Sequence, residues 1–180
     1  MAVTGSVGKT TTKDMLYAVM SQKYNTLKTP GNKNNDIGLP LTIFTLEKEH
    51  EAAVLEMGMN HFGEIDHLAS IAEPDVAVIT NIGMSHIENL GSQEGIFKAK
   101  MEITNRFTKN NTLIVNGDDK FLSHTKGMGD YKVVYYGINN PENDVYAKDI
   151  NDKGIDGINF TAVVNGKEYK VEVNNAGIHN

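Results

Sequence analysis

Residues 3–12, with the sequence V-T-G-S-V-G-K-T-T-T, combine residue types that can bind phosphate. Gly5 and Gly8 would form a tight turn before a helix, and backbone N–H groups at such a turn point at a common anion site that the helix dipole favours. Lys9 can reach the outer phosphates of a nucleotide, and the Thr10 hydroxyl can bind Mg²⁺. The stretch predicts a phosphate loop. The strict pattern G-x-x-x-x-G-K-[ST] is not met, because valine occupies its first glycine position, so a plain turn remains the alternative.

Glu56 and His86 are candidate metal ligands. Glu56 follows a run of four apolar residues, where a side chain would project over the carboxyl edge of a parallel sheet, and open α/β sheets bind ligands at that edge. A magnesium–nucleotide site needs such oxygen ligands. His86 lies shortly after the next apolar run, in T-N-I-G-M-S-H, and could reach the same edge. A solvated strand-end acid and an incidental loop histidine are the alternatives.

Lys100 stands on the apolar stripe of a predicted helix over residues 93–107. Its neighbours at helical spacing include Ile96, Phe97 and Ile103, where a lysine is unexpected. A long lysine can extend past such a stripe to solvent. Otherwise a desolvated lysine loses its proton readily, and the neutral amine can take up CO₂ to form a carbamate, which is a metal ligand.

Residues 31–40, G-N-K-N-N-D-I-G-L-P, place asparagines between turn residues. This stretch can form a loop with Asp36 as a helix cap. It also offers amide donors and acceptors to a polar substrate, and we select Asn35 as the candidate contact.

The bulk composition excludes several classes of function. The 180 residues carry a net charge of −6 with scattered lysines, which argues against a nucleic-acid surface. There are no cysteines, so disulfides and thiolate metal sites are excluded. No apolar run approaches the roughly 20 residues of a membrane span, and residues 1–20 do not show the basic-then-apolar pattern of a leader, so we expect neither feature. A cytoplasmic location is the default expectation.

Alternating strand and helix patterns predict an α/β fold of the P-loop type, a mostly parallel sheet flanked by helices. Helices are predicted over residues 10–22, 37–46, 63–72 and 93–107, and strands over residues 1–3, 52–56, 75–80, 112–116 and 132–136. From about residue 139 the chain becomes rich in Asn, Asp and Gly, with alternating segments around an Asn165–Gly166 turn. We expect an α/β body over residues 1–138 and a small antiparallel β appendage over residues 139–175.

Together these motifs resemble the Mur ligases of peptidoglycan synthesis, in particular the branch that adds D-alanyl-D-alanine. The phosphate loop, the asparagine-rich stretch and T-N-I-G-M-S-H resemble successive family motifs, as do V-L-E-M-G-M-N-H-F-G-E-I, K-A-K-M-E-I and V-N-G-D-D. The terminal G-I-H-N resembles the start of the segment that contacts adenine. The resemblance implies that residues 1–180 form the central ATP-binding domain of a three-domain enzyme. The N-terminal UDP-sugar-binding domain and the C-terminal Rossmann-like domain would then be absent.

The resemblance also implies a reaction. ATP would phosphorylate the terminal carboxylate of UDP-N-acetylmuramoyl-tripeptide, and the D-Ala-D-Ala amine would attack the acyl phosphate. Thr10 and Glu56 would hold one Mg²⁺, and His86 with carbamylated Lys100 a second; Lys9, His86 and Lys100 would be catalytic. The implied nucleotide contacts are Gly5, Ser6, Val7, Gly8, Lys9, Thr10, Thr11 and Asn180.

Three alternatives remain open. The chain could belong to another Mur-type ligase or to a folylpolyglutamate synthase relative, or it could be an unrelated P-loop phosphotransferase. The excised domain could also bind nucleotide without ligating anything, which is what we expect of it alone. We expect a monomer.

Overall fold

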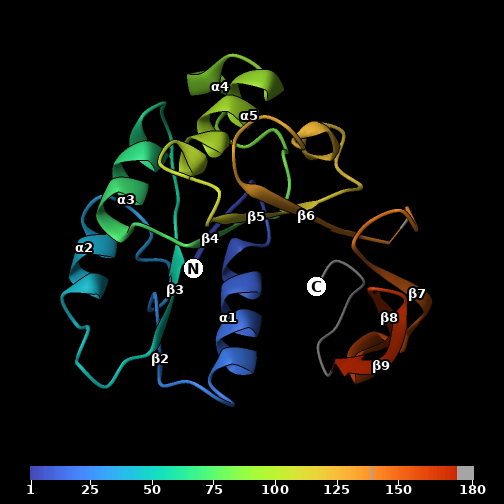
Figure 1. The fold of residues 1–180 in the computed structure, drawn as a ribbon. Helices are drawn as coiled ribbons and strands as arrows, with labels where there is room; N and C mark the ends of the chain where they lie inside the picture. Colours follow the sequence, from blue (N-terminus) through green and yellow to red (C-terminus); the bar gives the residue numbers. More distant parts are fainter. Residues whose placement is uncertain (139, 174–180) are drawn as a thin grey trace.

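The computed structural model describes residues 1–138 and 140–173, which form a nine-stranded sheet flanked by helices (Figure 1). The strand order is β2-β3-β1-β4-β5-β6-β7-β8-β9, parallel as far as β7 and antiparallel beyond it. The strands are β1 (Ala2–Thr4), β2 (Thr26–Lys28), β3 (Ala52–Glu56), β4 (Val76–Ile79), β5 (Thr112–Asn116), β6 (Lys132–Gly137), β7 (Val145–Asp152), β8 (Ile158–Val164) and β9 (Lys167–Val173). The helices are α1 (Lys9–Met20), α2 (Gly38–Ile43), α3 (Glu64–Ala72), α4 (Ile87–Leu90) and α5 (Gln93–Met101). The predicted fold class is confirmed.

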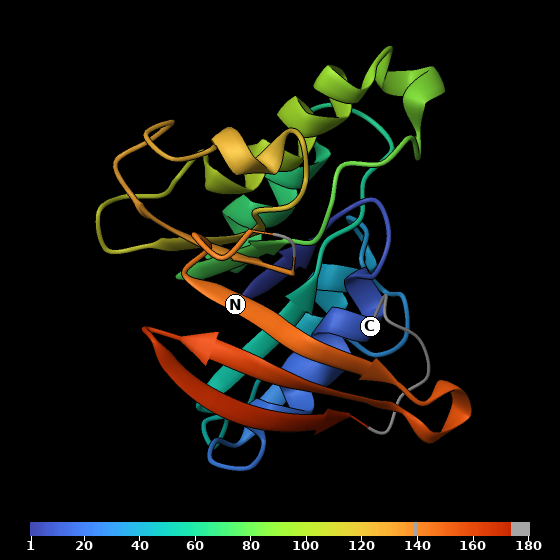
Figure 2. The ribbon, with the colours of Figure 1, turned by 90° about the vertical axis from the view of Figure 1, so that its right-hand side faces the viewer.

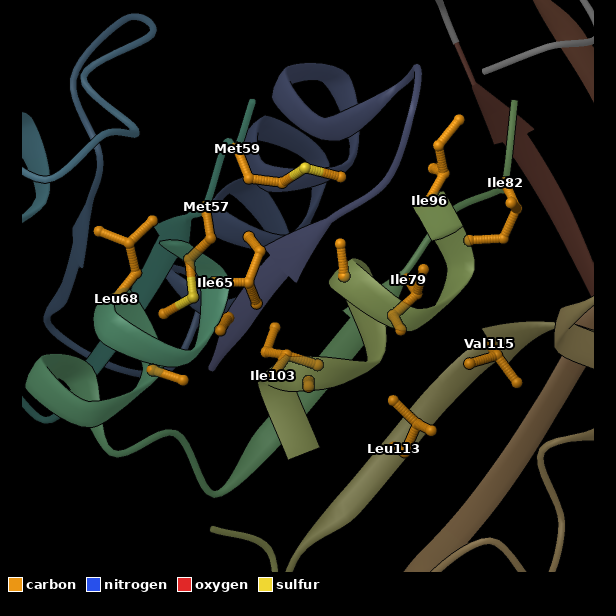
Figure 3. Close-up of a cluster of buried hydrophobic side chains, with 14 of the residues drawn as sticks. Met57, Met59, Ile65, Leu68, Ile79, Ile82, Ile96, Ile103, Leu113 and Val115 are labelled. Atoms are coloured by element: carbon orange, nitrogen blue, oxygen red, sulfur yellow. The ribbon is translucent and has the colours of Figure 1, made fainter. Parts of the chain in front are cut away.

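The central parallel strands β1, β3, β4 and β5 carry apolar side chains on both faces of the sheet, since successive side chains of a strand point to opposite sides. On one face, Val3, Val54 and Val78 form a small cluster against Leu16 and Met20 of α1. On the other face, side chains of β4 and β5 pack with those of α3 and α5 in the main core (Figure 3). Its labelled members are Met57, Met59, Ile65, Leu68, Ile79, Ile82, Ile96, Ile103, Leu113 and Val115. The central strands are therefore held from both sides, which fixes the loops at their carboxyl ends.

Several predicted boundaries were wrong. The helix predicted over residues 93–107 ends as an α-helix at Met101 and continues as one 3₁₀ turn, Glu102–Thr104. The helix predicted over residues 37–46 is only the six residues of α2. The short strand β2 and the polar strand β7 were not predicted, because neither shows an apolar run that would identify it.

The antiparallel strands extend the main sheet. β7 pairs in parallel with β6 through Tyr136 with Val145 and Gly137 with Tyr146, and β8 and β9 follow as antiparallel neighbours. The turn at Asn165 has a positive φ of 50°, as its sequence predicted. In Figure 2 these three strands, coloured orange to red, lie nearest to the viewer, in front of the part of the sheet that the helices cover.

In the part of the chain that the structure describes, none of the helices has the length and apolar character that crossing a membrane would need.

Candidate functional site

The predicted phosphate loop connects β1 to α1, and its two glycines are required by geometry. Gly8 is the N-cap residue of α1 with a φ of 80°, which glycine adopts without strain. A Cβ on Gly5 would lie 1.9 Å from the Thr80 hydroxyl oxygen, so no larger residue fits there without rearrangement. The loop therefore places backbone N–H groups at the start of a twelve-residue helix, the arrangement that binds anions.

The end of β4 holds this loop from the neighbouring strand. The Asn81 side chain accepts a hydrogen bond from the Val7 N–H (3.0 Å) and donates one to the Val7 carbonyl (3.1 Å). The Thr80 hydroxyl donates to the same carbonyl at 2.6 Å, and the Ser6 hydroxyl accepts from the Gly83 N–H at 2.8 Å. Sequence reasoning overlooked Thr80 and Asn81. The signal that could have found them is their position at the end of a strand adjacent to β1.

Lys9 lies folded over the loop. Its Nζ donates to the carbonyls of Gly5 (2.8 Å) and Ser6 (3.3 Å). Burial lowers the pKa of Lys9, and the Glu56 carboxylate partly opposes this shift. The ammonium is thus already at the loop where the phosphates of a nucleotide would bind.

Glu56 lies at the end of β3 beside α1, where the sequence predicted it, and its side chain is 1% exposed. Its Oε1 accepts hydrogen bonds from the Thr10 hydroxyl (3.2 Å) and the Asn34 side-chain amide (2.7 Å). Its Oε2 is buried without a hydrogen-bond partner among the described residues. The Lys13 ammonium lies 3.6 Å from this oxygen, beyond hydrogen-bond distance. A carboxylate with one oxygen free of hydrogen bonds and the other beside a hydroxyl offers the oxygen ligands that a hard cation such as Mg²⁺ prefers.

Asn34 is the asparagine of residues 31–40 that contacts Glu56. The Asn35 side chain instead accepts a hydrogen bond from the Gly38 N–H (2.8 Å) at the start of α2. Sequence reasoning missed Asn34, because nothing in a run of neighbouring asparagines distinguishes one from the next. A substrate contact at Asn35 remains a prediction.

Lys100 is buried, so the alternative in which it extends to solvent was wrong. It is 3% exposed, on the core-facing side of α5. Burial is the larger cause and the positive charge of Lys9 the smaller one, and together they lower the pKa of Lys100 to about 7. Within residues 1–138 and 140–173 its Nζ has no hydrogen bond or ion pair. A buried amine with a pKa of about 7 is neutral far more often than an ordinary lysine at neutral pH, and the neutral form is the one that reacts with CO₂ to form a carbamate.

His86 is a predicted metal ligand that no hydrogen bond or ion pair among the described residues joins to the rest of the site. His86 precedes α4 with a positive φ of 65°, and no described residue bonds to its ring. Asn180 lies outside the described residues. No group of three or more His, Asp or Glu side chains in the described part of the chain could hold a metal by itself. A second metal at His86 and Lys100 therefore remains a prediction.

Comparison with known proteins identifies the family. The family model described as the Mur ligase middle domain matches residues 3–180. The chain belongs to the Mur ligase family. A curated relative of this Mur ligase domain is the UDP-N-acetylmuramoyl-tripeptide–D-alanyl-D-alanine ligase of Bacillus subtilis, 55% identical over 124 residues, which are 69% of this chain and 27% of the relative.

Solved structures agree with this assignment of the Mur ligase domain. MurF from Acinetobacter baumannii matches 99% of this chain and 39% of its own, with a TM-score of 0.88 and 37% identity. MurF ligase from Thermotoga maritima, in complex with ADP, matches 95% of this chain and 39% of its own, with a TM-score of 0.84 and 36% identity. The chain thus spans well under half the length of the proteins it matches.

Proposed function

We propose that this chain is the ATP-binding domain of a ligase that joins D-Ala-D-Ala to UDP-N-acetylmuramoyl-tripeptide through an acyl phosphate. The observation that carries the proposal is the phosphate loop beside the buried Glu56 carboxylate, with the Thr10 hydroxyl 3.2 Å from Oε1. The similarity to named ligases of this specificity, one of them described in complex with ADP, supports the substrates and the nucleotide.

The chemistry explains why such a ligase needs a nucleotide site. A carboxylate is a poor electrophile, because amide formation would have to expel oxide; phosphorylation turns that oxygen into a phosphate leaving group. The amine then forms the C–N bond, and ADP, phosphate and a proton are released. The domain's task is to position the groups and to balance the phosphate charge.

Each of the predicted site residues has its own role in this task. The loop N–H groups and Lys9 bind the phosphates, with Thr80 and Asn81 holding the loop in shape. Thr10 and Glu56 are the residues that would hold Mg²⁺, which supplies charge neutralisation at the phosphates when bound. His86 and carbamylated Lys100 would hold a second ion.

Carbamate formation at Lys100 follows from its low basicity. The neutral amine attacks the carbon of CO₂, an N–C bond forms, one C=O π bond opens, and the nitrogen proton leaves to solvent. The buried group then carries a negative charge in place of a positive one. Near Lys9, this change converts a repulsion between cations into an attraction.

Labelled bicarbonate tests this site in the intact chain. ¹³C NMR should show one carbamate signal that disappears in Lys100→Met and persists in Lys98→Met, the matched control for an exposed lysine on the same helix. Absence of the signal from the unaltered chain would contradict carbamylation of Lys100.

The chain alone should bind nucleotide without ligating its substrates, since it represents only part of the relatives' length. Incubation with ATP, Mg²⁺ and both peptide substrates should therefore give no product. Measurable ligation would contradict this part of the proposal. A monomeric state and a cytoplasmic location, where ATP and UDP-linked precursors are made, complete the proposal.

A further inference from the structure

Lys13 is a buried charge that the proposed chemistry does not use. It lies on α1 one turn after Lys9, and its side chain is 1% exposed. Its Nζ donates a hydrogen bond to the Gly31 carbonyl at 2.8 Å and lies 3.6 Å from Glu56 Oε2 and 3.7 Å from Asp14 Oδ1. A buried ammonium is costly unless it is paired, so this placement calls for a reason.

The contacts of Lys13 join three segments that are far apart in sequence. One is the helix that begins at the phosphate loop, the second is the end of β3 at Glu56, and the third is the asparagine-rich loop at Gly31. Three residues after Gly31, Asn34 donates to Glu56 Oε1. Lys13 therefore stands beside one carboxylate oxygen and anchors the loop that binds the other.

We propose that Lys13 is a positioning residue for the cation site. It acts through Glu56, both by its charge beside Oε2 and by fixing the loop that carries Asn34. This inference rests on the proposed function, in which Glu56 binds Mg²⁺. Partners behind a metal ligand orient it, and their removal typically weakens metal binding 10- to 100-fold.

A purely structural role for Lys13 would make a different prediction. Loss of a buried ion pair then lowers stability but leaves the Mg²⁺ dependence of nucleotide binding unchanged. Lys28 provides the matched control, because it belongs to the same charge cluster without bonding to Glu56. Its Nζ pairs with Asp14 Oδ1 at 2.7 Å, and its side chain is 35% exposed.

The experiment titrates Mg²⁺ against a fluorescent ADP analogue bound by the unaltered chain and by Lys13→Met, Lys28→Met and Glu56→Gln. In Lys13→Met the half-saturating Mg²⁺ concentration should rise about tenfold, while analogue affinity without Mg²⁺ stays within about twofold. In Glu56→Gln the half-saturating Mg²⁺ concentration should rise at least as much. In Lys28→Met it should stay within about twofold of the value for the unaltered chain.

The possible results distinguish a failure of the positioning role of Lys13 from a failure of the proposed function. A Lys13→Met value equal to that of Lys28→Met overturns the positioning role, and so does a lower value, which would make Lys13 only a competing cation. If Glu56→Gln causes no shift, or the unaltered chain binds the analogue without regard to Mg²⁺, the proposed function itself fails.

A double variant keeps the inference testable if Lys13→Met does not fold. Lys13→Met combined with Glu56→Gln leaves no lone buried charge, so it should fold where the single variant does not. Because Lys13 acts through Glu56, the double variant should match Glu56→Gln in half-saturating Mg²⁺ within about twofold. A further shift beyond about threefold would mean that Lys13 acts by another route, and would overturn the inference.

Discussion

Lys100→Met should stabilise the domain at neutral pH, because the native fold buries an amine that the unfolded chain keeps charged. The side chain is 3% exposed, and burial, followed by the charge of Lys9, lowers the pKa of Lys100 from 10.5 to about 7. Between those two values the unfolded chain binds more protons than the folded chain. The stability of the unaltered domain therefore rises with pH across this range.

The size of the effect follows from the same values. Each pKa unit corresponds to about 1.4 kcal/mol, so the fold loses about 5 kcal/mol by burying this amine when the pH is at or below the folded pKa. Methionine has nearly the same length and no charge. We expect Lys100→Met to raise the free energy of unfolding by about 3 to 5 kcal/mol at pH 7 and by about 2 kcal/mol at pH 9.

Urea unfolding at pH 7 and pH 9, in buffer free of CO₂ so that the amine stays unmodified, measures both gains. Lys98→Met is the control, an exposed substitution on the same helix that should change the free energy of unfolding by less than about 0.5 kcal/mol. A Lys100→Met variant that is less stable than the unaltered chain, or a gain that does not shrink with rising pH, would refute the reasoning.

Three further substitutions test the loop and the core. Gly5→Ala should cost about 2 kcal/mol or more in urea unfolding, because its Cβ would meet the Thr80 hydroxyl; an unchanged midpoint would contradict the close approach. Asn81→Ala removes two hydrogen bonds to Val7 and should weaken nucleotide binding by about tenfold in calorimetry with little change in circular dichroism, whereas full affinity would show that the loop needs no clamp. Met57→Ala empties a fully buried site and should cost about 2 to 5 kcal/mol in denaturant unfolding; a cost under about 1 kcal/mol would place Met57 outside the packed core.

The parts of the site that could be predicted from sequence are those set by periodicity. An apolar run ending in Glu56 predicts a buried strand with a carboxylate at its end, and the structure has β3 there. The apolar neighbours of Lys100 predicted a lysine on the core face of a helix, which its burial confirms. The alternation of strand and helix patterns along the chain, together with the turn residues between them, was enough to predict the α/β class.

The parts that could not be predicted depend on tertiary contacts. Lys13 precedes Asp14, so the sequence suggests a pair of charged residues on the surface. In the fold Lys13 is buried instead, and its ammonium lies beside the Glu56 carboxylate and donates a hydrogen bond to the Gly31 carbonyl. Only the folded loop shows that Asn34 reaches Glu56. Strand β7 alternates poorly and is recognisable mainly by its pairing with β6 and β8.

The most direct test of the central claim is calorimetric titration of the chain with Mg²⁺ and a non-hydrolysable ATP analogue, beside Lys9→Ala. The account predicts binding in the unaltered chain and its loss in Lys9→Ala, with nearly unchanged thermal unfolding. Equal affinity in the two proteins would contradict the assignment of residues 3–12 as the phosphate loop.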